Sequence, residues 1–321
     1  MMANKLNTNG GMKISFLMAA HNEEKIIGEA LDSLSKIPYE NYEVIIGLDG
    51  CTDGTEGIVK RYCKKNKKMR YFKLNLREGK PAVINEIIQK AKGEIIIIND
   101  ADWIFKFGNE KMFRNMLSVF KNPKIGGIAD SFPVEWQEDK LKKAGIGFKM
   151  VAYSSYFWLQ FQKKAFAEKN SSEEYAFLKK PTMFLTNIFR RKLYNRNSSL
   201  GDDFERTYDV MAQGYKIVFF SDIEMPRMIS TYDKVNIRDL FKQKIRTAIA
   251  RRQIEPEQKI NFTNYYFPAV VYMNRESWKN GVETGLLVAL WTVLTAFSSL
   301  LSRFSKKDTK EGWTLRAKRG D

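Results

Sequence analysis

Apolar and polar positions alternate in blocks along the first part of the chain. Short apolar runs of the kind that form strands are Lys13–Ala20, Glu43–Leu48 and Arg70–Asn75. The segments between them repeat apolar residues at helical spacing, as Ile27 and Leu31 do. Because strand and helix alternate repeatedly within about the first 100 residues, the pattern predicts an α/β fold with a doubly wound, mostly parallel sheet and helices on both faces.

The stretch from Gly93 to Trp103 is the strongest single signal. Its four consecutive isoleucines are β-branched and too few for an independent helix, so they predict a strand buried on both faces. Asp100 and Asp102 follow this strand, and ligands of open α/β sheets bind outside the carboxyl ends of the strands. Two carboxylates at this spacing can approach one hard cation such as Mg²⁺. By itself, the spacing occurs more often in an ordinary acidic turn.

Later segments have patterns that predict further elements. Met112 to Phe120 has a helical apolar stripe, and Gly126 to Asp130 suits a short strand. Gly145 to Phe166 is rich in aromatic residues and is interpreted as a core helix, with a membrane-facing or acceptor-lining segment as the alternative. Lys163 to Lys180 is charged and predicts a solvated loop or helix, and Arg238 to Arg252 predicts a basic helix.

The charge balance narrows the choice of partners. The chain has 321 residues, with 54 Lys and Arg against 37 Asp and Glu, and its net charge of +17 favours nucleic acid, an anionic membrane or phosphorylated substrates. A nucleic-acid-binding module therefore stays open as an alternative. Cys51 and Cys63 are too few for a disulfide framework and indicate a reducing cytosolic compartment. His21 is the one histidine in the sequence, so a metal site built from several histidines is excluded.

Four motifs occur in an order that is typical of one enzyme family. They are Asn22-Glu23-Glu24, Asp49 to Thr55, Gly79 to Asn85, and Gly93 to Asp102. Together they resemble glycosyltransferase family 2, whose members have the GT-A fold, over roughly residues 13–250 with a thin match between residues 129 and 181. The resemblance implies an inverting enzyme that transfers a sugar from a nucleotide-diphosphate sugar and uses Mg²⁺ or Mn²⁺.

The resemblance assigns roles to several residues by position. Asp49 matches the carboxylate that accepts a hydrogen bond from the nucleobase. Asp102 matches the main metal ligand, and Asp100 matches its partner, which contacts the ribose or reaches the metal through water. His21 lies where the family often has an aromatic residue lining the base pocket, and Ala19 is expected in the same pocket. A divalent cation at this place stabilises the charge that develops on the departing diphosphate.

Some of these positions have plainer explanations or depart from the family pattern. His21 alone is equally consistent with a partly buried histidine at a strand end. Lys80 and Asn85 follow the family's Lys-x-x-x-x-Asn pattern, which shapes the nucleotide pocket, but they are equally typical of a helix start. Leu48 replaces an acidic residue that many members have, and Cys51 replaces a common serine. Uracil is the preferred base and guanine the alternative.

Two later motifs concern the acceptor and the leaving group. Inverting transfer needs one general base to take the acceptor's proton, and Asp203 matches the residue that the family uses. Its Asp-Asp pair also suits an ordinary helix N-terminus. Gln243 and Arg246 match the family's Gln-x-x-Arg motif, near the acceptor and the pyrophosphate respectively, although alone they indicate a solvated basic face. Thr247 stands where polymer-making members have a tryptophan, which favours a non-processive enzyme.

The segment Thr284–Ser302 contains no charged residue and is rich in leucine. As a helix it is about long enough to cross a membrane, but residues 303–321 are much more basic than residues 264–283. The positive-inside rule keeps that tail cytosolic, on the side of a domain that uses nucleotide sugars, so a single crossing fits poorly. A re-entrant or interface-lying helix with the basic tail on anionic lipid satisfies both constraints.

The combined prediction is a glycosyltransferase on the cytoplasmic face of the cell membrane that acts on a lipid-linked or membrane-proximal glycan and binds no nucleic acid. The predicted parts are a mobile leader (1–11), a GT-A catalytic domain (12–232), a basic helical region (233–283), a hydrophobic membrane helix (284–302) and a basic tail (303–321). A processive polysaccharide synthase of the same family and an inactive scaffold are alternatives. The donor sugar, the linkage and the oligomeric state stay open.

Overall fold

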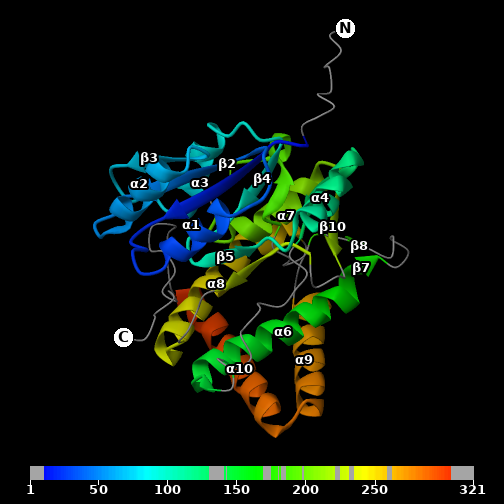
Figure 1. The fold of residues 1–321 in the computed structure, drawn as a ribbon. Helices are drawn as coiled ribbons and strands as arrows, with labels where there is room; N and C mark the ends of the chain where they lie inside the picture. Colours follow the sequence, from blue (N-terminus) through cyan, green and yellow to red (C-terminus); the bar gives the residue numbers. More distant parts are fainter. Residues whose placement is uncertain are drawn as a thin grey trace.

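The computed structural model describes residues 11–129, 141, 143–168, 175–179, 181, 186–196, 199–220, 225–230, 235–258 and 262–304. Residues 1–10 of the expected leader, residues 305–321 of the basic tail and parts of the segments predicted at 126–130 and 163–180 lie outside the described residues. The described residues form one large sheet, a second sheet of two strands, and a group of C-terminal helices (Figure 1).

The N-terminal part forms the alternating strands and helices that the sequence predicts. In order these are β1 (Ile14–Ala20), α1 (Ile27–Ser35), β2 (Tyr42–Asp49), α2 (Thr55–Lys65), β3 (Met69–Leu74), α3 (Lys80–Ile88) and β4 (Ile95–Ile98). The four strands are parallel and lie in the order β3-β2-β1-β4. Pro81 lies in the first turn of α3, where a missing N–H leaves no helical hydrogen bond unmade. The predicted parallel, doubly wound arrangement is confirmed here.

The second part of the large sheet is mixed. Its elements are β5 (Trp103–Lys106), α4 (Glu110–Ser118), β6 (Ile125–Ile128), β7 (Ala167–Glu168), β8 (Tyr175–Leu178), β9 (Ile188–Arg190), α7 (Asp202–Ala212), β10 (Lys216–Phe220) and β11 (Arg227–Ser230). β9 runs antiparallel between β4 and β6, in a nine-stranded order β3-β2-β1-β4-β9-β6-β10-β8-β7, while β5 pairs with β11. The hydrophobic pattern predicts no such insertion, because a strand of three residues is too short to show a period.

The isoleucines of β4 divide between two hydrophobic cores. Ile95 and Ile97 belong to the core that contains apolar residues of α1, α2 and α4, whereas Ile96 and Ile98 belong to the core with α3 and α7. All four side chains are at most 1% exposed. A strand covered on both faces needs an apolar residue at every position, which explains the uninterrupted run. Within the sheet β4 lies between β1 and β9. Its carboxyl end, which Asp100 follows, therefore lies in the inner part of the sheet rather than at an outer strand.

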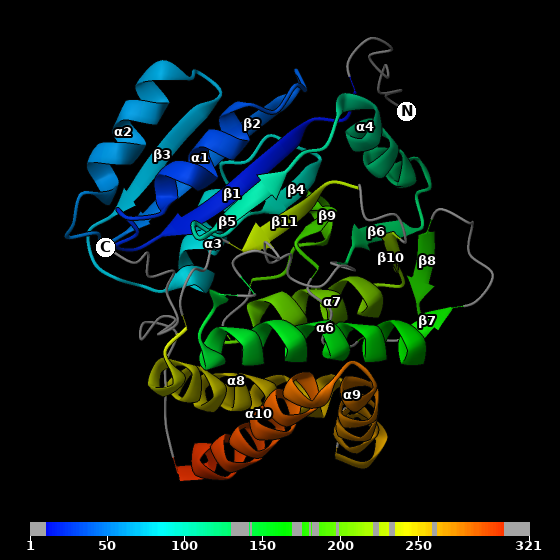
Figure 2. The same ribbon diagram turned by 60° about the horizontal axis from the view of Figure 1, so that its bottom comes forward.

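Four long helices pack together on one side of the sheet. They are α6 (Ile146–Phe166), α8 (Ile237–Gln258), α9 (Phe267–Lys279), which follows a π-helical turn, and α10 (Val282–Leu301). Figure 2 shows α6 between the sheet and the pair α8 and α10. Met150 and Phe157 of α6 share a core with Leu240, Met273 and Val288 from the other three helices. This packing confirms the core-helix interpretation of the aromatic segment.

The hydrophobic C-terminal segment forms α10. Together with the turn that follows it, Val282–Phe304 is long and apolar enough to cross a membrane, and it is the one such helix among the described residues. One side of α10 packs closely on α9, because a Cβ atom added to Gly285 would lie 2.4 Å from the ring of Trp278. A larger residue at this contact would require the Trp278 ring to move. α10 also contacts α6 and α8, so three neighbouring helices hold it to the protein.

Candidate active site

The carboxyl ends of β1, β2 and β4 meet at one edge of the sheet because the three strands are parallel. Ala19 lies in β1 opposite Gly47 of β2, and His21 follows the end of β1. The ring nitrogen Nδ1 of His21 donates a hydrogen bond to the carbonyl oxygen of Asp49, at 2.5 Å. The structure therefore brings Ala19, His21 and Asp49 together, as the predicted base pocket requires.

The first two sequence motifs hold each other in place. The side chain of Asn22 accepts a hydrogen bond from the backbone N–H of Thr52, and Asn22 itself has a left-handed backbone with φ of 54°. Glu24 accepts from the backbone N–H of Gly54, at 2.7 Å. The Thr55 hydroxyl accepts from the backbone N–H of Glu23. These contacts join the loop after β1 to the loop after β2, so most of the motif residues position the edge on which Asp49 lies.

Asp49 is 3% exposed and ties β2 to the start of α3. Its Oδ1 accepts a hydrogen bond from the backbone N–H of Glu78 at 2.7 Å, and its Oδ2 accepts from that of Gly79 at 2.9 Å. Gly79 has φ of 91°, a conformation that favours glycine. A carboxylate oxygen has two lone pairs, so each oxygen of Asp49 can still accept one hydrogen bond from a ligand.

Lys80, the first residue of α3, joins carboxylates from two distant elements. Its Nζ lies 2.9 Å from Oδ1 of Asp100 at the end of β4, and 3.3 Å from Oδ1 of Asp203 in the first turn of α7. Asp202 lies slightly farther away, at 3.9 Å. Lys80 and Asp203 are 123 residues apart in the sequence. The two residues predicted to act on the donor and on the acceptor are thereby bridged by one ammonium group.

Arg206 is a member of this cluster that the sequence motifs do not reveal. Its side chain is 2% exposed and donates to Asp202 at 2.9 Å and to Asp203 at 2.5 Å. It also donates to the side chain of Asn187 and to the carbonyl of Thr186. The available signal is its spacing, because an arginine three and four residues after two aspartates lies on the same helix face.

The cluster shifts the pKa values of its members in different directions. Burial raises the pKa of Asp203, but Lys80 and Arg206 lower it more, so the net pKa lies below the ordinary value. Burial raises the pKa of Asp100 above its ordinary value despite the opposing effect of Lys80. Burial lowers the pKa of Lys80, but the three carboxylates raise it above its usual range. Asp203 is thus held ionised, the state in which a carboxylate accepts a proton.

Asp100 and Asp102 are the carboxylates that the sequence predicts as ligands of a divalent cation. Asp102 is half-buried in the turn between β4 and β5. No group of three His, Cys, Asp or Glu side chains suited to a metal occurs in the described part of the chain. Two carboxylates nevertheless fit Mg²⁺ or Mn²⁺, because such ions in nucleotide sites take their other oxygens from substrate phosphates and water. Lys80 contacts both oxygens of Asp100, so a bound metal has to share that carboxylate with the ammonium group.

The remaining predicted residues are Asn85 on α3 and Gln243 and Arg246 on α8. Asn85 is 7% exposed, and its Oδ1 accepts a hydrogen bond from the hydroxyl of Tyr194 at 2.7 Å. That contact links α3 to the segment after β9. Gln243 and Arg246 lie on α8, which contacts α7, and Arg246 is 7% exposed. The alternative interpretation of this segment as a solvated basic face is therefore wrong for Arg246, which is buried.

A family model for glycosyl transferase family 2 matches residues 15–187, more than half of the chain. Among similar curated proteins, poly-beta-1,6-N-acetyl-D-glucosamine synthase from Staphylococcus epidermidis is 33% identical over 115 residues, which are 36% of this chain and 27% of that protein. Beta-monoglucosyldiacylglycerol synthase from Nostoc sp. is 28% identical over 156 residues, 47% of this chain and 32% of that protein. The matched segments thus span only part of the length of these relatives.

The solved structures agree with the family model on the fold. A mannosyltransferase from Pyrobaculum calidifontis in complex with GDP-Man and Mn²⁺ has a TM-score of 0.57 and 18% identity, over 92% of this chain and 90% of that chain. The predicted GT-A-type arrangement of a mostly parallel sheet and its covering helices is confirmed. The four motifs meet at one sheet edge, and the family model matches residues 15–187. The chain therefore belongs to glycosyl transferase family 2.

Proposed function

We propose that the chain transfers a sugar, with inversion, from a nucleotide-diphosphate sugar to a hydroxyl of a lipid-linked or membrane-proximal glycan. The observation that carries this proposal is the bridge from Asp100 through Lys80 to Asp203. In it a half-buried, ionised carboxylate from α7 lies beside the strand end that suits the donor diphosphate. A binding module for nucleic acid has no need for this arrangement of acids around one ammonium group.

In the proposed mechanism, Asp203 takes the proton from the acceptor hydroxyl as that oxygen attacks the anomeric carbon. The bond from the anomeric carbon to the diphosphate oxygen breaks in the same step, and the diphosphate leaves with the bonding electrons. Lys80 is placed to attract the leaving group, and Arg206 holds Asp203 in position. A divalent cation held by Asp100 and Asp102 supplies additional positive charge when it is bound.

The base of the donor is proposed to lie against Ala19, His21 and Asp49. A free lone pair on each oxygen of Asp49 suits the N–H of a uracil ring, and guanine is the alternative. Asn85 is proposed to shape the nucleotide pocket, with Gln243 and Arg246 serving the acceptor and the leaving group. The names of the similar curated proteins, a polysaccharide synthase and a glycolipid synthase, support a glycan or lipid acceptor.

The exposed side of α10 supports a place at the membrane surface. Six large apolar side chains of α10 are 49% to 68% exposed, and we call this set the α10 ridge. They are Val282, Leu286, Leu290, Val293, Phe297 and Leu300. The opposite side of the helix packs on α6, α8 and α9. A helix attached to the protein body in this way is suited to lie in the membrane interface, with its apolar side in the lipid. The proposed location is the cytoplasmic face of the cell membrane, where nucleotide sugars are available.

The test of the proposed reaction is Asp203→Asn in the full chain, with Asp209→Asn on the same helix as the matched control. Replacing the base is expected to lower turnover about 10²- to 10⁴-fold, because an amide does not accept the proton. Binding of UDP with Mn²⁺, measured by calorimetry, is expected to stay within about twofold. Equal turnover in the two variants would exclude Asp203 as the base, and loss of nucleotide binding would assign it a structural role instead.

Product size tests whether transfer is processive. Thr247 is half-buried on α8 where a stacking tryptophan is expected in polymer-making members, and the described residues contain one candidate membrane helix. Transfer of one or a few sugars is therefore proposed. A ladder that extends to high polymer from the purified chain and excess donor would favour the processive synthase.

A further inference from the structure

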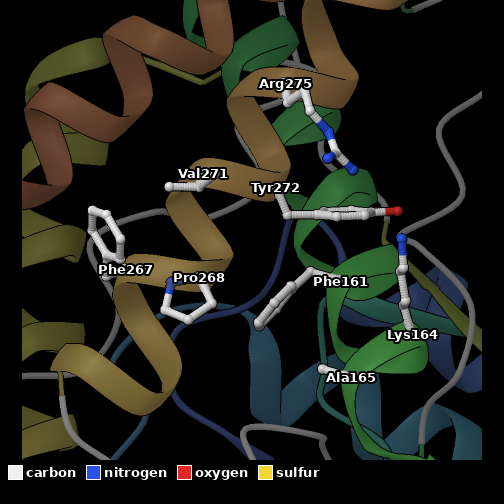
Figure 3. A pocket seen from close by; sticks show the side chains of 8 residues that line it. All are labelled: Phe161, Lys164, Ala165, Phe267, Pro268, Val271, Tyr272 and Arg275. Carbon is white, nitrogen blue, oxygen red and sulfur yellow. The ribbon is translucent and has the colours of Figure 1, made fainter.

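A groove between α6 and α9 lies outside the candidate active site. Its volume is about 540 Å³, within the range of small-molecule pockets. Phe161, Lys164 and Ala165 line it from α6, and Pro268, Tyr272 and Arg275 line it from α9. Figure 3 shows that these side chains come from two helices that pack side by side. None of them belongs to the cluster around Lys80, so the reaction described above does not account for this groove.

The two ends of the groove differ in polarity. Lys164 and Arg275 gather on one side, around the hydroxyl end of Tyr272, and the other side is formed by phenylalanine, proline and valine side chains (Figure 3). The Nζ of Lys164 lies 5.4 Å from the centre of the Tyr272 ring. Such a surface offers a few strong donors and a continuous apolar wall. It suits a ligand that is anionic at one end and apolar along the rest.

The charges around the groove leave a surplus of positive charge. Arg275 pairs with Glu276 at 2.7 Å, and Lys279 shares the same carboxylate at 3.0 Å. Among the described residues, Lys164 contacts the Tyr272 ring and forms no ion pair. Arg275 and Lys279 share one carboxylate, and Lys164 pairs with none of the described acids, so the positive charge here exceeds the negative charge. A phosphate can balance that surplus, because its oxygens accept charge-assisted hydrogen bonds from lysine and arginine.

The rim of the groove is exposed and apolar. Phe267 is 54% exposed and Val271 is 49% exposed, although both also line the groove. α9 leads directly into α10, which has the exposed α10 ridge. A sugar or a nucleotide needs several hydrogen-bonding groups along its length, and this wall supplies none beyond its cationic end. A lipid in the bilayer needs only the polar end and the apolar wall.

We propose that the groove between α6 and α9 binds one anionic phospholipid, with its phosphate between Lys164 and Arg275 and one acyl chain along Phe161 and Pro268. The proposal rests on the membrane location inferred above and adds a specific lipid site to it. Bound in this way, the lipid anchors the helices beside the α10 ridge through a defined headgroup. General attraction of a basic protein to a charged surface requires no such site.

The test is native mass spectrometry of the full chain in detergent, with phosphatidylglycerol and phosphatidylcholine of identical acyl chains. We expect one phosphatidylglycerol to be retained and phosphatidylcholine to be lost. The variant Lys164→Gln/Arg275→Gln is expected to weaken retention about tenfold or more, because it removes both charged donors to the phosphate. Lys279→Gln is the matched control, since it removes a charge that pairs with the same Glu276 outside the groove, and it is expected to retain the lipid.

Two further measurements distinguish a phospholipid headgroup from inorganic phosphate as the ligand. Ala165→Leu fills the apolar wall, so it should weaken retention of the phospholipid but leave binding of inorganic phosphate unchanged. Inorganic phosphate that displaces the phospholipid at micromolar concentration would overturn a lipid site in favour of a simple anion site. Equal retention of both phospholipids, or an equal loss in Lys279→Gln and the double variant, would also overturn the proposal. Binding of UDP to the unaltered protein, measured separately, reports on the proposed transferase function alone.

Discussion

The site at the sheet edge and the C-terminal helices accommodate their charged residues in opposite ways. At the sheet edge, Lys80 and Arg206 lie within 4 Å of three carboxylates, so each charge has a partner of opposite sign. Among the helices, the Nζ of Lys244 lies 3.7 Å from the ring centre of Trp291. Burial and the nearby Arg251 lower the pKa of Lys244 well below its usual value.

The comparison separates two kinds of environment. A cluster of paired charges with little exposure is stabilised by its own hydrogen bonds and keeps a fixed geometry, as catalysis requires. The helices instead hold a cation against an aromatic ring and expose large apolar side chains, and exposed apolar side chains of this kind are suited to contact something outside the protein. Changes at the sheet edge should therefore cost activity and stability, whereas changes on the α10 ridge should cost only the external contact.

The largest effect is expected from Asp102→Asn. The amide keeps the shape of the side chain but removes the negative charge that a divalent ion needs. Turnover and Mn²⁺-dependent binding of UDP should both be lost, as measured by product formation and by calorimetry with and without the metal. Asp32→Asn, on the exposed side of α1, is the control. Mn²⁺-dependent activity that persists in Asp102→Asn would remove this residue from the metal site.

The next largest effect is expected from Arg206→Leu, which leaves the buried Asp202 and the half-buried Asp203 without the guanidinium group. Breaking a buried ion pair by removing one partner costs about 3–5 kcal/mol in the free energy of unfolding. Urea denaturation measures it, with the exposed Arg61→Leu as control. A loss no larger than that of the control would show that Lys80 alone is sufficient for the acidic pair.

A smaller loss of unfolding free energy is expected from Asp49→Asn, measured in the absence of ligand. An amide has one oxygen, so only one of the two backbone N–H groups of Glu78 and Gly79 keeps its acceptor. A buried donor without an acceptor costs about 1–3 kcal/mol. The control is Glu40→Gln, whose side chain is fully exposed. An unchanged unfolding free energy in Asp49→Asn would mean that the loop before α3 rearranges at little cost.

The smallest effect on stability is expected on the α10 ridge. The double substitution Leu290→Gln/Val293→Gln should change the unfolding free energy by less than about 0.5 kcal/mol, because both side chains already face outward. Sedimentation with anionic vesicles should fall strongly in the same variant. A stability loss above about 2 kcal/mol would instead show that this face is covered in solution by a second copy of the chain, and sedimentation velocity would then detect the dimer.

The parts predictable from sequence are those whose signal is local. The four isoleucines of β4 and the two aspartates after them indicate both the strand and the chemistry of its end, because both faces of the strand demand the same residue type. The antiparallel β9 and the contacts of Arg206 were not predictable in this way. They depend on pairing between segments far apart in the chain, which leaves no period in either segment. Asp203 was found only through the family resemblance, because Asp-Asp alone indicates a helix start.

The bridge made by Lys80 also has a consequence for the order of events during protein synthesis. The ribosome completes Lys80 and Asp100 long before Asp203, which follows Lys80 by 123 residues. At about 5–20 residues per second, that interval is roughly 6–25 s. During it the β3-β2-β1-β4 sheet can already form, while β4 still has no neighbour on the side that β9 later occupies. A nascent chain is therefore expected to acquire the donor half of the site first, with an open strand edge that only the arrival of β9 protects from other chains.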